Sequence, residues 1–565
     1  MKFKENIIDN IYNQNLGLKK SEIEEILEIP PDDKLGDFAF PCFKLASLLK
    51  TAPQKISLDL AEKLKSNDNL FEIKSVGAYV NFFINEEEVG IDLKNRIDKF
   101  GEDYGNSNYG KNEKIIVEFS STNIAKPFHI GHIRSTVIGN ALNNIYKSQG
   151  YDTVRINYLG DYGTQFGMMI SAYKKWGDIN AINENPIQEL LKLYVRYNKE
   201  AEEDENLMEE ARYWFEQLEN KNQEALKIWQ LFKDLSLEEF LRVYKMLNIE
   251  FDSYDGEYYN SQFIPSLLEE LKNKNLLEES EGAMIINLEK YNLPPALIVK
   301  SNGSSTYITR DIATAINRKK VYDFKKNLYV VASQQNLHFQ QLKAIIELMG
   351  YEWYKDCIHI PFGMVSMKDG AMKTRTGKVI FLEDVLNKSI EKTKDIIEDR
   401  KSDILNKDEI SKDVGIGAVI FQELFNGRIK DYVFDWDILL NFDGETGPYV
   451  QYTHARASSV LRKTDFNYMD NIKFSEIETD EEKALLKNLY KFNDILINAC
   501  EKNEPYILTR YLVDISKDFN KFYNSVNILN SSENNLKIRL FLTYVSKIVL
   551  SHGLKILGIK SPDRM

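Results

Sequence analysis

One short string in the chain combines residues that could do chemistry, and it consists of Phe128, His129, Ile130, Gly131 and His132 (FHIGH). Two imidazoles three residues apart at the start of a helix direct hydrogen-bond donors toward one spot. The free N–H groups and positive end of the helix dipole favour an anion there. Gly131 lets a flat base approach the backbone. The string therefore predicts a nucleotide-phosphate site, and the alternative is a helix cap with two surface histidines.

The segments around this string predict the frame that positions it. Residues 114–119 (KIIVEF) predict a strand, residues 120–128 a loop, and residues 132–149 a helix with one apolar face at a 3.6-residue period. Residues 153–159 (TVRINYL) predict the next strand. A strand, loop, helix and strand in this order predict a doubly wound parallel sheet, which binds ligands at the carboxyl ends of its strands.

Several segments resemble one enzyme family. The string at 129–132, after the first strand of a Rossmann-like domain, is similar to the HIGH signature of class I aminoacyl-tRNA synthetases. Four segments resemble arginyl-tRNA synthetases in particular: 118–135 (EFSSTNIAKPFHIGHIRS), 157–167 (NYLGDYGTQFG), 306–311 (TYITRD) and 330–341 (VVASQQNLHFQQ). The resemblance covers nearly the whole chain in the family's order. It implies a ligase of protein biosynthesis that joins arginine to its tRNA with ATP.

The resemblance implies an ATP site built from two signatures. His129, His132 and Lys126 are implied as catalytic, and Phe128 to His132 as ATP-binding. The second signature, KMSKS, is matched by residues 372–378 (MKTRTGK), where Thr376 stands at the position of the second lysine. In this family a lysine just before HIGH often compensates, and Lys126 fits that role. The basic residues of the second stretch remain available for phosphate: Lys373, Arg375 and Lys378. A solvated basic loop is the alternative for this stretch taken alone.

The resemblance also implies an arginine site, made of Glu118, Asn123, Glu257, Tyr307, Asp311 and Gln335. A planar guanidinium favours carboxylates in a forked arrangement. Tyr307 and Asp311 stand at i and i+4, on one face of a helical turn. Glu257 is the second carboxylate. Asn123 and Gln335 are expected to hold the α-amino and carboxylate ends. Alternatively, Asp311 is a helix N-terminal acid, Glu257 a surface turn residue and Tyr307 a packing residue.

The implied reaction needs no side-chain nucleophile. The arginine carboxylate attacks the α-phosphorus of ATP in line and releases pyrophosphate, and the activated arginine then passes to the 3′-terminal adenosine of tRNA. The protein mainly positions the reactants and stabilises charge. Mg²⁺ is expected with ATP and pyrophosphate, and no protein-bound structural metal is expected. The family typically needs tRNA even for the activation step, so we expect the same here.

The predicted fold class combines four parts. It is an α/β Rossmann-like catalytic domain with an acidic, mainly helical insertion, an α+β N-terminal domain and an all-α C-terminal anticodon-binding domain. The expected boundaries are 1–108 for the tRNA-elbow-recognition domain, 109–388 for the catalytic domain with its insertion at about 178–290, 389–445 for a helical linker and stem-contact region, and 446–565 for the anticodon-binding domain.

The charge is unevenly distributed over the 565 residues. The chain has 73 Lys and Arg against 86 Asp and Glu, a net −13 that would argue against a nucleic-acid partner. Residues 178–290 alone hold 26 acidic and 12 basic side chains, so the rest of the chain is close to neutral. Residues 446–565 hold 17 basic and 14 acidic side chains. Phosphate binding depends on local fields, so we expect tRNA to bind away from the acidic insertion.

Residues 449–463 (YVQYTHARASSVLRK) resemble the opening of the family's anticodon-binding domain. Aromatic side chains can stack single-stranded bases, so we expect three residues to bind tRNA: Tyr449, Tyr452 and Arg456. Core packing is the alternative for each aromatic residue.

Three scattered cysteines argue against a disulfide framework or a Cys-rich zinc site. The N-terminal segment lacks an apolar signal-peptide region, and no apolar run reaches the ~18 residues of a membrane span. We expect a cytoplasmic monomer without a membrane partner.

Two other functions remain open from the sequence. One is a related class I synthetase for another amino acid, against which the acids Asp311 and Glu257 argue. The other is a synthetase-like RNA-binding or regulatory protein, against which the retained His129, His132 and Lys126 argue.

Overall fold

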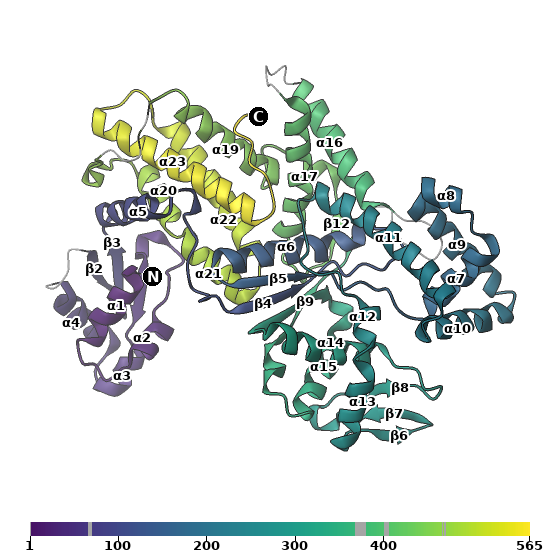
Figure 1. Ribbon diagram of the computed structural model, residues 1–565. Helices are drawn as coiled ribbons and strands as arrows, with labels where there is room; N and C mark the ends of the chain where they lie inside the picture. The colour runs from purple at the N-terminus through teal and green to yellow at the C-terminus, as the bar shows by residue number, and fades with distance from the viewer. Residues whose placement is uncertain (1, 66–69, 368–379, 400–405, 466, 468–470) are drawn as a thin grey trace. The chain divides into compact units, whose positions relative to one another are not determined.

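The computed structural model describes residues 2–65, 70–367, 380–399, 406–465, 467 and 471–565 (Figure 1). These residues form two compact units. The first comprises residues 1–104, 460–494 and 517–549, and the second comprises residues 105–459, 495–516 and 550–565. Each unit is described by itself below.

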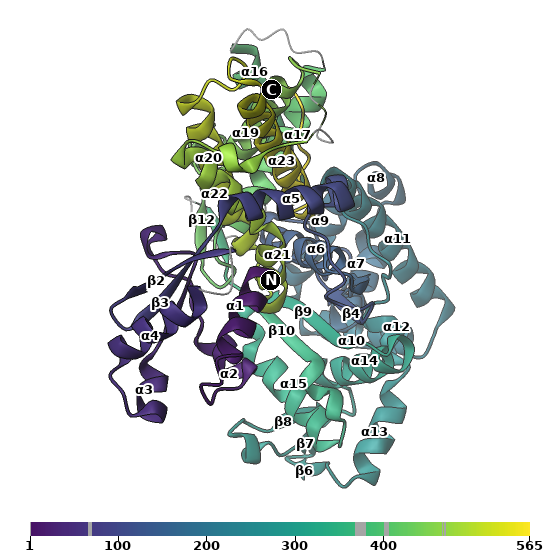
Figure 2. The same ribbon diagram turned by 90° about the vertical axis from the view of Figure 1, so that its left-hand side faces the viewer.

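The second unit is built on a four-stranded parallel sheet with the strand order β10-β9-β4-β5 (Figures 1 and 2). Its strands are β4 (Lys114–Glu118), β5 (Asp152–Ile156), β9 (Lys326–Ala332) and β10 (Cys357–Phe362). Apolar and β-branched residues dominate these runs, as burial on both faces of a parallel sheet requires. The predicted strand–loop–helix–strand order is present, since α6 (Ile133–Ser148) connects β4 to β5.

Helices cover both faces of this sheet. In Figure 1, α6 lies on one side and α14 (Tyr307–Tyr322) and α15 (Asn336–Leu348) lie on the other. A core cluster that includes Ile116, Ile312 and Ile345 fills the space between the sheet and α14 and α15. On the opposite face, an added Cβ at Gly139 of α6 would stand 2.1 Å from the Phe119 Cβ. The helix can therefore lie close to the end of β4 only because this position is a glycine.

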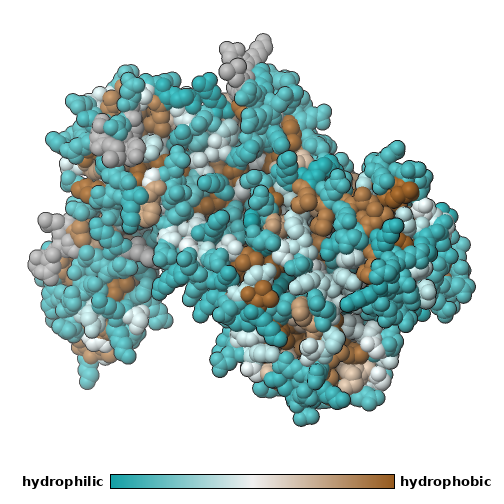
Figure 3. Space-filling view, viewed as in Figure 1, coloured by the Kyte–Doolittle hydropathy of each residue, from teal (hydrophilic) through white to brown (hydrophobic). Residues whose placement is uncertain are grey.

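The acidic insertion is largely helical, and its outer edge, at the right of Figure 3, is hydrophilic. Its helices are α8 (Ile179–Glu184), α9 (Pro186–Ala201), α10 (Glu205–Glu219), α11 (Gln223–Met246), α12 (Glu257–Ser261) and α13 (Ile264–Asn273), and α7 (Thr164–Trp176) precedes it. The segment is thus mainly helical, as predicted, but its C-terminal end also contains strands that the helical pattern did not indicate. There β6 (Glu278–Ser280) and β7 (Ala283–Ile286) form an antiparallel sheet with β8 (Ala296–Val299). All three residues of β6 are exposed and polar, so this strand lacks the alternation of apolar and polar residues by which a strand is predicted.

After the sheet, the second unit contains a small parallel strand pair and further helices. The pair is β11 (Val365–Met367) and β12 (Tyr432–Phe434). The helices that begin in this unit are α16 (Leu382–Asp399), α17 (Lys407–Phe425), α18 (Trp436–Leu439), α19 (Gly447–Leu461) and α22 (Tyr506–Ser525).

The first unit contains an antiparallel sheet with the strand order β1-β3-β2. Its strands are β1 (Phe38–Pro41), β2 (Phe71–Val76) and β3 (Tyr79–Ile84). The helices that begin in this unit are α1 (Lys2–Tyr12), α2 (Lys20–Ile26), α3 (Phe43–Leu49), α4 (Pro53–Lys65), α5 (Glu86–Phe100), α20 (Asp480–Tyr490), α21 (Phe492–Lys502) and α23 (Glu533–Ile556). Asp37 joins the sheet to α20, because its Oδ2 atom accepts hydrogen bonds from the Ile84 amide (2.8 Å) and from the Lys487 Nζ (2.9 Å).

Two findings concern cysteines and membranes. Cys42, Cys357 and Cys500 are all buried free thiols. Across the described part of the chain, no helix combines the length and the apolar character needed to cross a membrane.

Candidate active site

A cavity of about 330 Å³ lies at the carboxyl end of the parallel sheet. It brings together residues from β4, from the loop after β5, from β9 and from the first turn of α14. The predicted site residues that line it are Glu118, Asn123, Gly131, His132, Glu257, Tyr307, Asp311 and Gln335. Segments that are up to about two hundred residues apart in sequence therefore meet in one place.

The loop between β4 and the FHIGH string is held in an unusual conformation. Ser120, Ser121 and Ala125 have positive φ angles of 68°, 47° and 58°, a region that non-glycine residues rarely adopt. Such strain persists only where the surroundings impose it, and it concentrates at functional sites. Here the Ser120 amide donates to Ser135 Oγ (2.9 Å) and the Ala125 amide donates to Ser236 Oγ (2.8 Å). These buried hydroxyls fix the loop that precedes the two histidines.

His129 and His132 stack with ring centroids 3.9 Å apart. The Nδ1 atom of His129 accepts a hydrogen bond from the Gly131 amide (3.1 Å), and the Nδ1 atom of His132 accepts one from the His129 amide (3.2 Å). Burial lowers the pKa of His129 to about 4 and the pKa of His132 well below its ordinary value. Both rings are therefore neutral at pH 7. Because Nδ1 accepts, the proton resides on Nε2, which is left as a donor.

The FHIGH string pairs with the segment that follows residues 368–379. The Ile130 amide donates to the Ile380 carbonyl (3.2 Å), and the Leu382 amide donates to the Phe128 carbonyl (2.9 Å). The side chains of Phe128 and Ile130 are buried in the protein core, so only their backbones can face a nucleotide. Thr376 and the three predicted phosphate-binding residues of the second signature, Lys373, Arg375 and Lys378, lie outside the described residues.

A buried arginine ties the same helix to the strand that leads into the second signature. Arg134, in the first turn of α6, is fully buried and donates from Nη1 to the carbonyls of Gly363 (3.0 Å) and Lys430 (2.7 Å). These carbonyls precede β11 and β12, respectively. Its Nε atom lies 3.6 Å from Glu423 Oε2, and burial raises the pKa of that carboxyl to about 7. Arg134 thus sets the position of the β11–β12 pair relative to the histidines.

Lys126 is half-buried and lies beside the helical insertion. Its Nζ atom is 5.4 Å from the ring centroid of Tyr194 in α9. The ring face is an attractive environment for an ammonium group, so the insertion orients this lysine next to the FHIGH string.

Asp311 has one engaged and one open carboxylate oxygen. Its Oδ2 atom is 2.7 Å from His338 Nε2, whereas its buried Oδ1 atom has no hydrogen-bond partner among the residues that the structure describes. Tyr307, one helical turn earlier, also lines the cavity, and its ring centroid is 4.8 Å from that of His338. The negative charge of Asp311 raises the pKa of Tyr307, whose phenol stays protonated. A buried acceptor without a donor is costly, so Oδ1 is a candidate acceptor for a cationic ligand.

Glu257 and Glu118 line the cavity but already have cationic partners. Glu257 Oε2 is 3.2 Å from the Arg310 Nε, and burial raises the pKa of Glu257 to about 8 although Arg310 opposes this shift. Glu118 Oε2 accepts a hydrogen bond from Arg318 Nη1, and burial also raises the pKa of Glu118. Sequence reasoning missed Arg318 and His338, because each lies far along the chain from the carboxylate it contacts.

The two residues expected to hold the ends of arginine lie on loops at the cavity. Asn123 forms an isolated parallel bridge with Gly160. An added Cβ at Gly160 would stand 2.3 Å from Asn123 Oδ1, so the glycine leaves room for this amide. Gln335, in the 3₁₀ turn after β9, is exposed at the cavity rim.

The three predicted tRNA-binding residues share one face of α19. Tyr449, Tyr452 and Arg456 are all half-exposed, and the Arg456 guanidinium lies 5.0 Å from the Tyr452 ring centroid. Tyr452 also packs against a core cluster that contains Ile410 and Phe442. It is therefore partly a packing residue.

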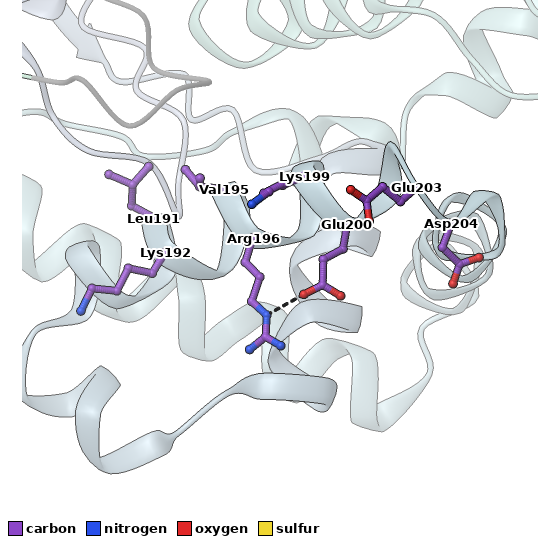
Figure 4. Close-up of a pocket in the computed structure, with 8 residues that line it drawn as sticks. All are labelled: Leu191, Lys192, Val195, Arg196, Lys199, Glu200, Glu203 and Asp204. Atoms are coloured by element: carbon purple, nitrogen blue, oxygen red, sulfur yellow. Dashed lines mark hydrogen bonds and ion pairs between the residues drawn. The ribbon is translucent and has the colours of Figure 1, made fainter.

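A larger hollow, of about 900 Å³, runs along α9 (Figure 4). All its lining residues come from α9 and the turn after it, and Figure 4 shows their side chains fanning out along one helix, with Arg196 paired to Glu200 at 2.9 Å. Because no second element supplies converging groups, this hollow lacks the features of a ligand site. Within the described residues, no cluster of three or more His, Cys, Asp or Glu side chains could hold a metal ion.

Family models match three parts of the chain. The model described as "tRNA synthetases class I (R), catalytic domain" matches residues 99–436. The chain belongs to the arginyl-tRNA synthetase family. "Arginyl tRNA synthetase N terminal domain" matches residues 2–84, and "DALR anticodon binding domain" matches residues 450–565.

Individual arginyl-tRNA synthetases support the same conclusion. The chain is 53% identical to the arginine–tRNA ligase of Halothermothrix orenii over 100% of both chains. It is 52% identical to that of Clostridioides difficile over 97% of both chains. The solved arginyl-tRNA synthetase of Thermus thermophilus shares its fold, with a TM-score of 0.82 at 24% identity over 95% of this chain and 96% of that one. The family resemblance and the fold class predicted from the sequence are confirmed.

Proposed function

We propose that the chain is an arginine–tRNA ligase that forms arginyl-adenylate and pyrophosphate from L-arginine and ATP, and then transfers arginine to the 3′-terminal adenosine of its tRNA. One observation carries this proposal. One cavity of about 330 Å³ is lined both by Asp311, whose Oδ1 atom has no hydrogen-bond partner among the described residues, and by His132 of the FHIGH string. A guanidinium and a nucleotide phosphate fit these two groups respectively.

In the activation step, the protein positions two substrates and stabilises the charge that develops on the phosphates. His129 and His132 act as neutral Nε2–H donors to the phosphate oxygens, and Lys126 adds a positive charge. The second signature contributes Lys373, Arg375 and Lys378. The phosphate oxygens of ATP and pyrophosphate would hold Mg²⁺, which would supply further positive charge there. Asp311, Tyr307 and Glu257 bind the guanidinium, while Asn123 and Gln335 hold the amino acid's ends. Glu118 supports the pocket through Arg318.

In the transfer step, the 3′ end of tRNA reaches the same cavity. We propose that residues 1–108 contact the tRNA elbow, that 389–445 contact its stem, and that 446–565 bind the anticodon through a surface including Tyr449, Tyr452 and Arg456. The catalytic domain then corresponds to residues 109–388. The enzyme acts as a cytoplasmic monomer, and the acidic insertion faces away from the tRNA.

The decisive experiment is an aminoacylation assay with purified protein, ATP, total tRNA and each of the twenty amino acids. We expect arginine alone to be charged, and arginine-dependent exchange of pyrophosphate into ATP to need tRNA. Charging of a different amino acid would support another class I synthetase. Binding of tRNA without any charging would favour an RNA-binding protein, and strong exchange without tRNA would contradict the proposed tRNA dependence.

The raised pKa of Glu257 predicts a pH-dependent affinity for arginine. A carboxylate binds a guanidinium better than a carboxylic acid does, and burial keeps Glu257 partly protonated up to its pKa of about 8. The KM for arginine should therefore fall several-fold, by up to about ten, between pH 7 and pH 9. Steady-state kinetics across this range would measure it. Glu257→Gln cannot ionise and should give a flatter profile, so an unchanged slope in that variant would exclude Glu257 as the cause.

A further inference from the structure

Each of the three carboxylates in the cavity is paired with a different basic side chain. Glu118 contacts Arg318, Glu257 contacts Arg310, and Asp311 contacts His338. The first two partners are permanently charged guanidinium groups. Such a group partly offsets the charge of the carboxylate with which it is paired.

The Asp311 pair differs because its partner is an imidazole. A neutral imidazole can donate one hydrogen bond from Nε2 and leave the charge of the carboxylate in place. The open Asp311 Oδ1 atom is buried in the cavity wall. The second oxygen of Asp311 is therefore left for a ligand.

The position of His338 is fixed by its surroundings. It lies in the first turn of α15, and its Nε2 atom is 2.7 Å from Asp311 Oδ2. Its ring centroid lies 4.8 Å from that of Tyr307 and 5.3 Å from that of Phe339, the latter in an edge-on arrangement. Aromatic contacts on two sides limit the orientations that the imidazole can adopt. The donor is thus held on Oδ2 and not on Oδ1.

We propose that His338, whose Nε2–H donor holds Asp311 Oδ2 and leaves Oδ1 for the guanidinium, is a positioning residue for arginine. This proposal rests on the proposed arginine–tRNA ligase function. It assigns to His338 the discrimination between a guanidinium and an uncharged group of the same shape. A permanent cation at this position would partly offset the charge of Asp311, as Arg310 and Arg318 do for their carboxylates.

Three substitutions in the full-length protein test this role by tRNA charging kinetics. His338→Gln places an amide donor near the Nε2 position, and the KM for arginine should stay within about 3-fold of wild type. His338→Ala removes the donor and should raise that KM about 10-fold. His338→Arg supplies a fixed charge and should raise it about 100-fold or more. The KM for ATP should stay within about 2-fold in each variant, since the proposed contact of Asp311 is with arginine.

A second measurement reports charge selection directly. Citrulline, the uncharged ureido analogue of arginine, serves as a competitive inhibitor, and its inhibition constant is divided by the KM for arginine. In His338→Arg this ratio should fall at least about 10-fold, because the pocket no longer favours a cation. A merely structural role for His338 would not change this ratio.

The proposal is wrong if His338→Arg binds arginine as wild type does. It is also wrong if all three variants raise the KM for ATP and for arginine equally, because His338 would then support only the fold. A wild-type protein that does not charge arginine would instead refute the proposed function itself. The two failures are therefore distinguishable.

Discussion

His132→Asn is expected to slow arginyl-adenylate formation about 100-fold, which corresponds to about 2.7 kcal/mol of transition-state stabilisation. The Asn Oδ1 atom can still accept the hydrogen bond from the His129 amide, which His132 Nδ1 accepts at 3.2 Å. The Nε2–H donor of the imidazole, however, is lost. The variant thus separates the support of the loop from the contact with phosphate, and tRNA-dependent pyrophosphate exchange measures the effect.

His132→Gln is the matched control, because its amide nitrogen reaches the position of Nε2 but it leaves the His129 amide without its acceptor. We expect this variant to be markedly faster than His132→Asn. If the two variants are equally impaired, or if His132→Asn retains wild-type activity, the donor at Nε2 does not stabilise the phosphates. Both rings are neutral well above the pKa of His129, which is about 4. The ratio of the wild-type rate to the rate of His132→Asn should therefore be the same at pH 6.5 and pH 8.

The nucleotide side of the site could be predicted because its determinants are local in sequence. β4, the FHIGH string and α6 follow each other within 35 residues. The pattern of apolar residues predicts both the strand β4 and the helix α6. The i, i+4 spacing of Tyr307 and Asp311 placed them on one face of α14, and both line the cavity. These relations depend on helix and strand geometry alone.

The charge state of the site could not be predicted in the same way. Arg318 is 200 residues from Glu118 along the chain, and His338 is 27 residues from Asp311. Pairs of this kind depend on how α14, α15 and β4 meet in the folded chain, and no local pattern encodes this. The neutral state of the two signature histidines likewise results from burial and from backbone donors to Nδ1. The sequence alone identifies the two histidines as hydrogen-bond donors but does not reveal their charge.

Asp311→Asn should lower kcat/KM for arginine about 1,000-fold, or about 4 kcal/mol, while the KM for ATP changes little. The Asn side chain has nearly the same shape, and its oxygen can still accept the hydrogen bond from His338 Nε2. Its amide nitrogen then occupies the place of Oδ1, which has no hydrogen-bond partner among the described residues. Two donors, the amide and the substrate guanidinium, would face each other in a buried site where neither finds an acceptor.

Asp323→Asn is the control for this substitution, because Asp323 follows the same helix, has a side chain that is 90% exposed and forms an i, i+4 ion pair with Lys319. Such a surface pair contributes little, so this variant should charge tRNA with arginine at the wild-type rate. Charging kinetics for both variants, with their thermal unfolding temperatures, distinguish a loss of binding from a loss of folded protein. If Asp311→Asn retains kcat/KM for arginine within about 5-fold of wild type at an unchanged unfolding temperature, the open oxygen is not the guanidinium acceptor. The negative charge that selects arginine would then have to come from Glu257, despite its ion pair with Arg310.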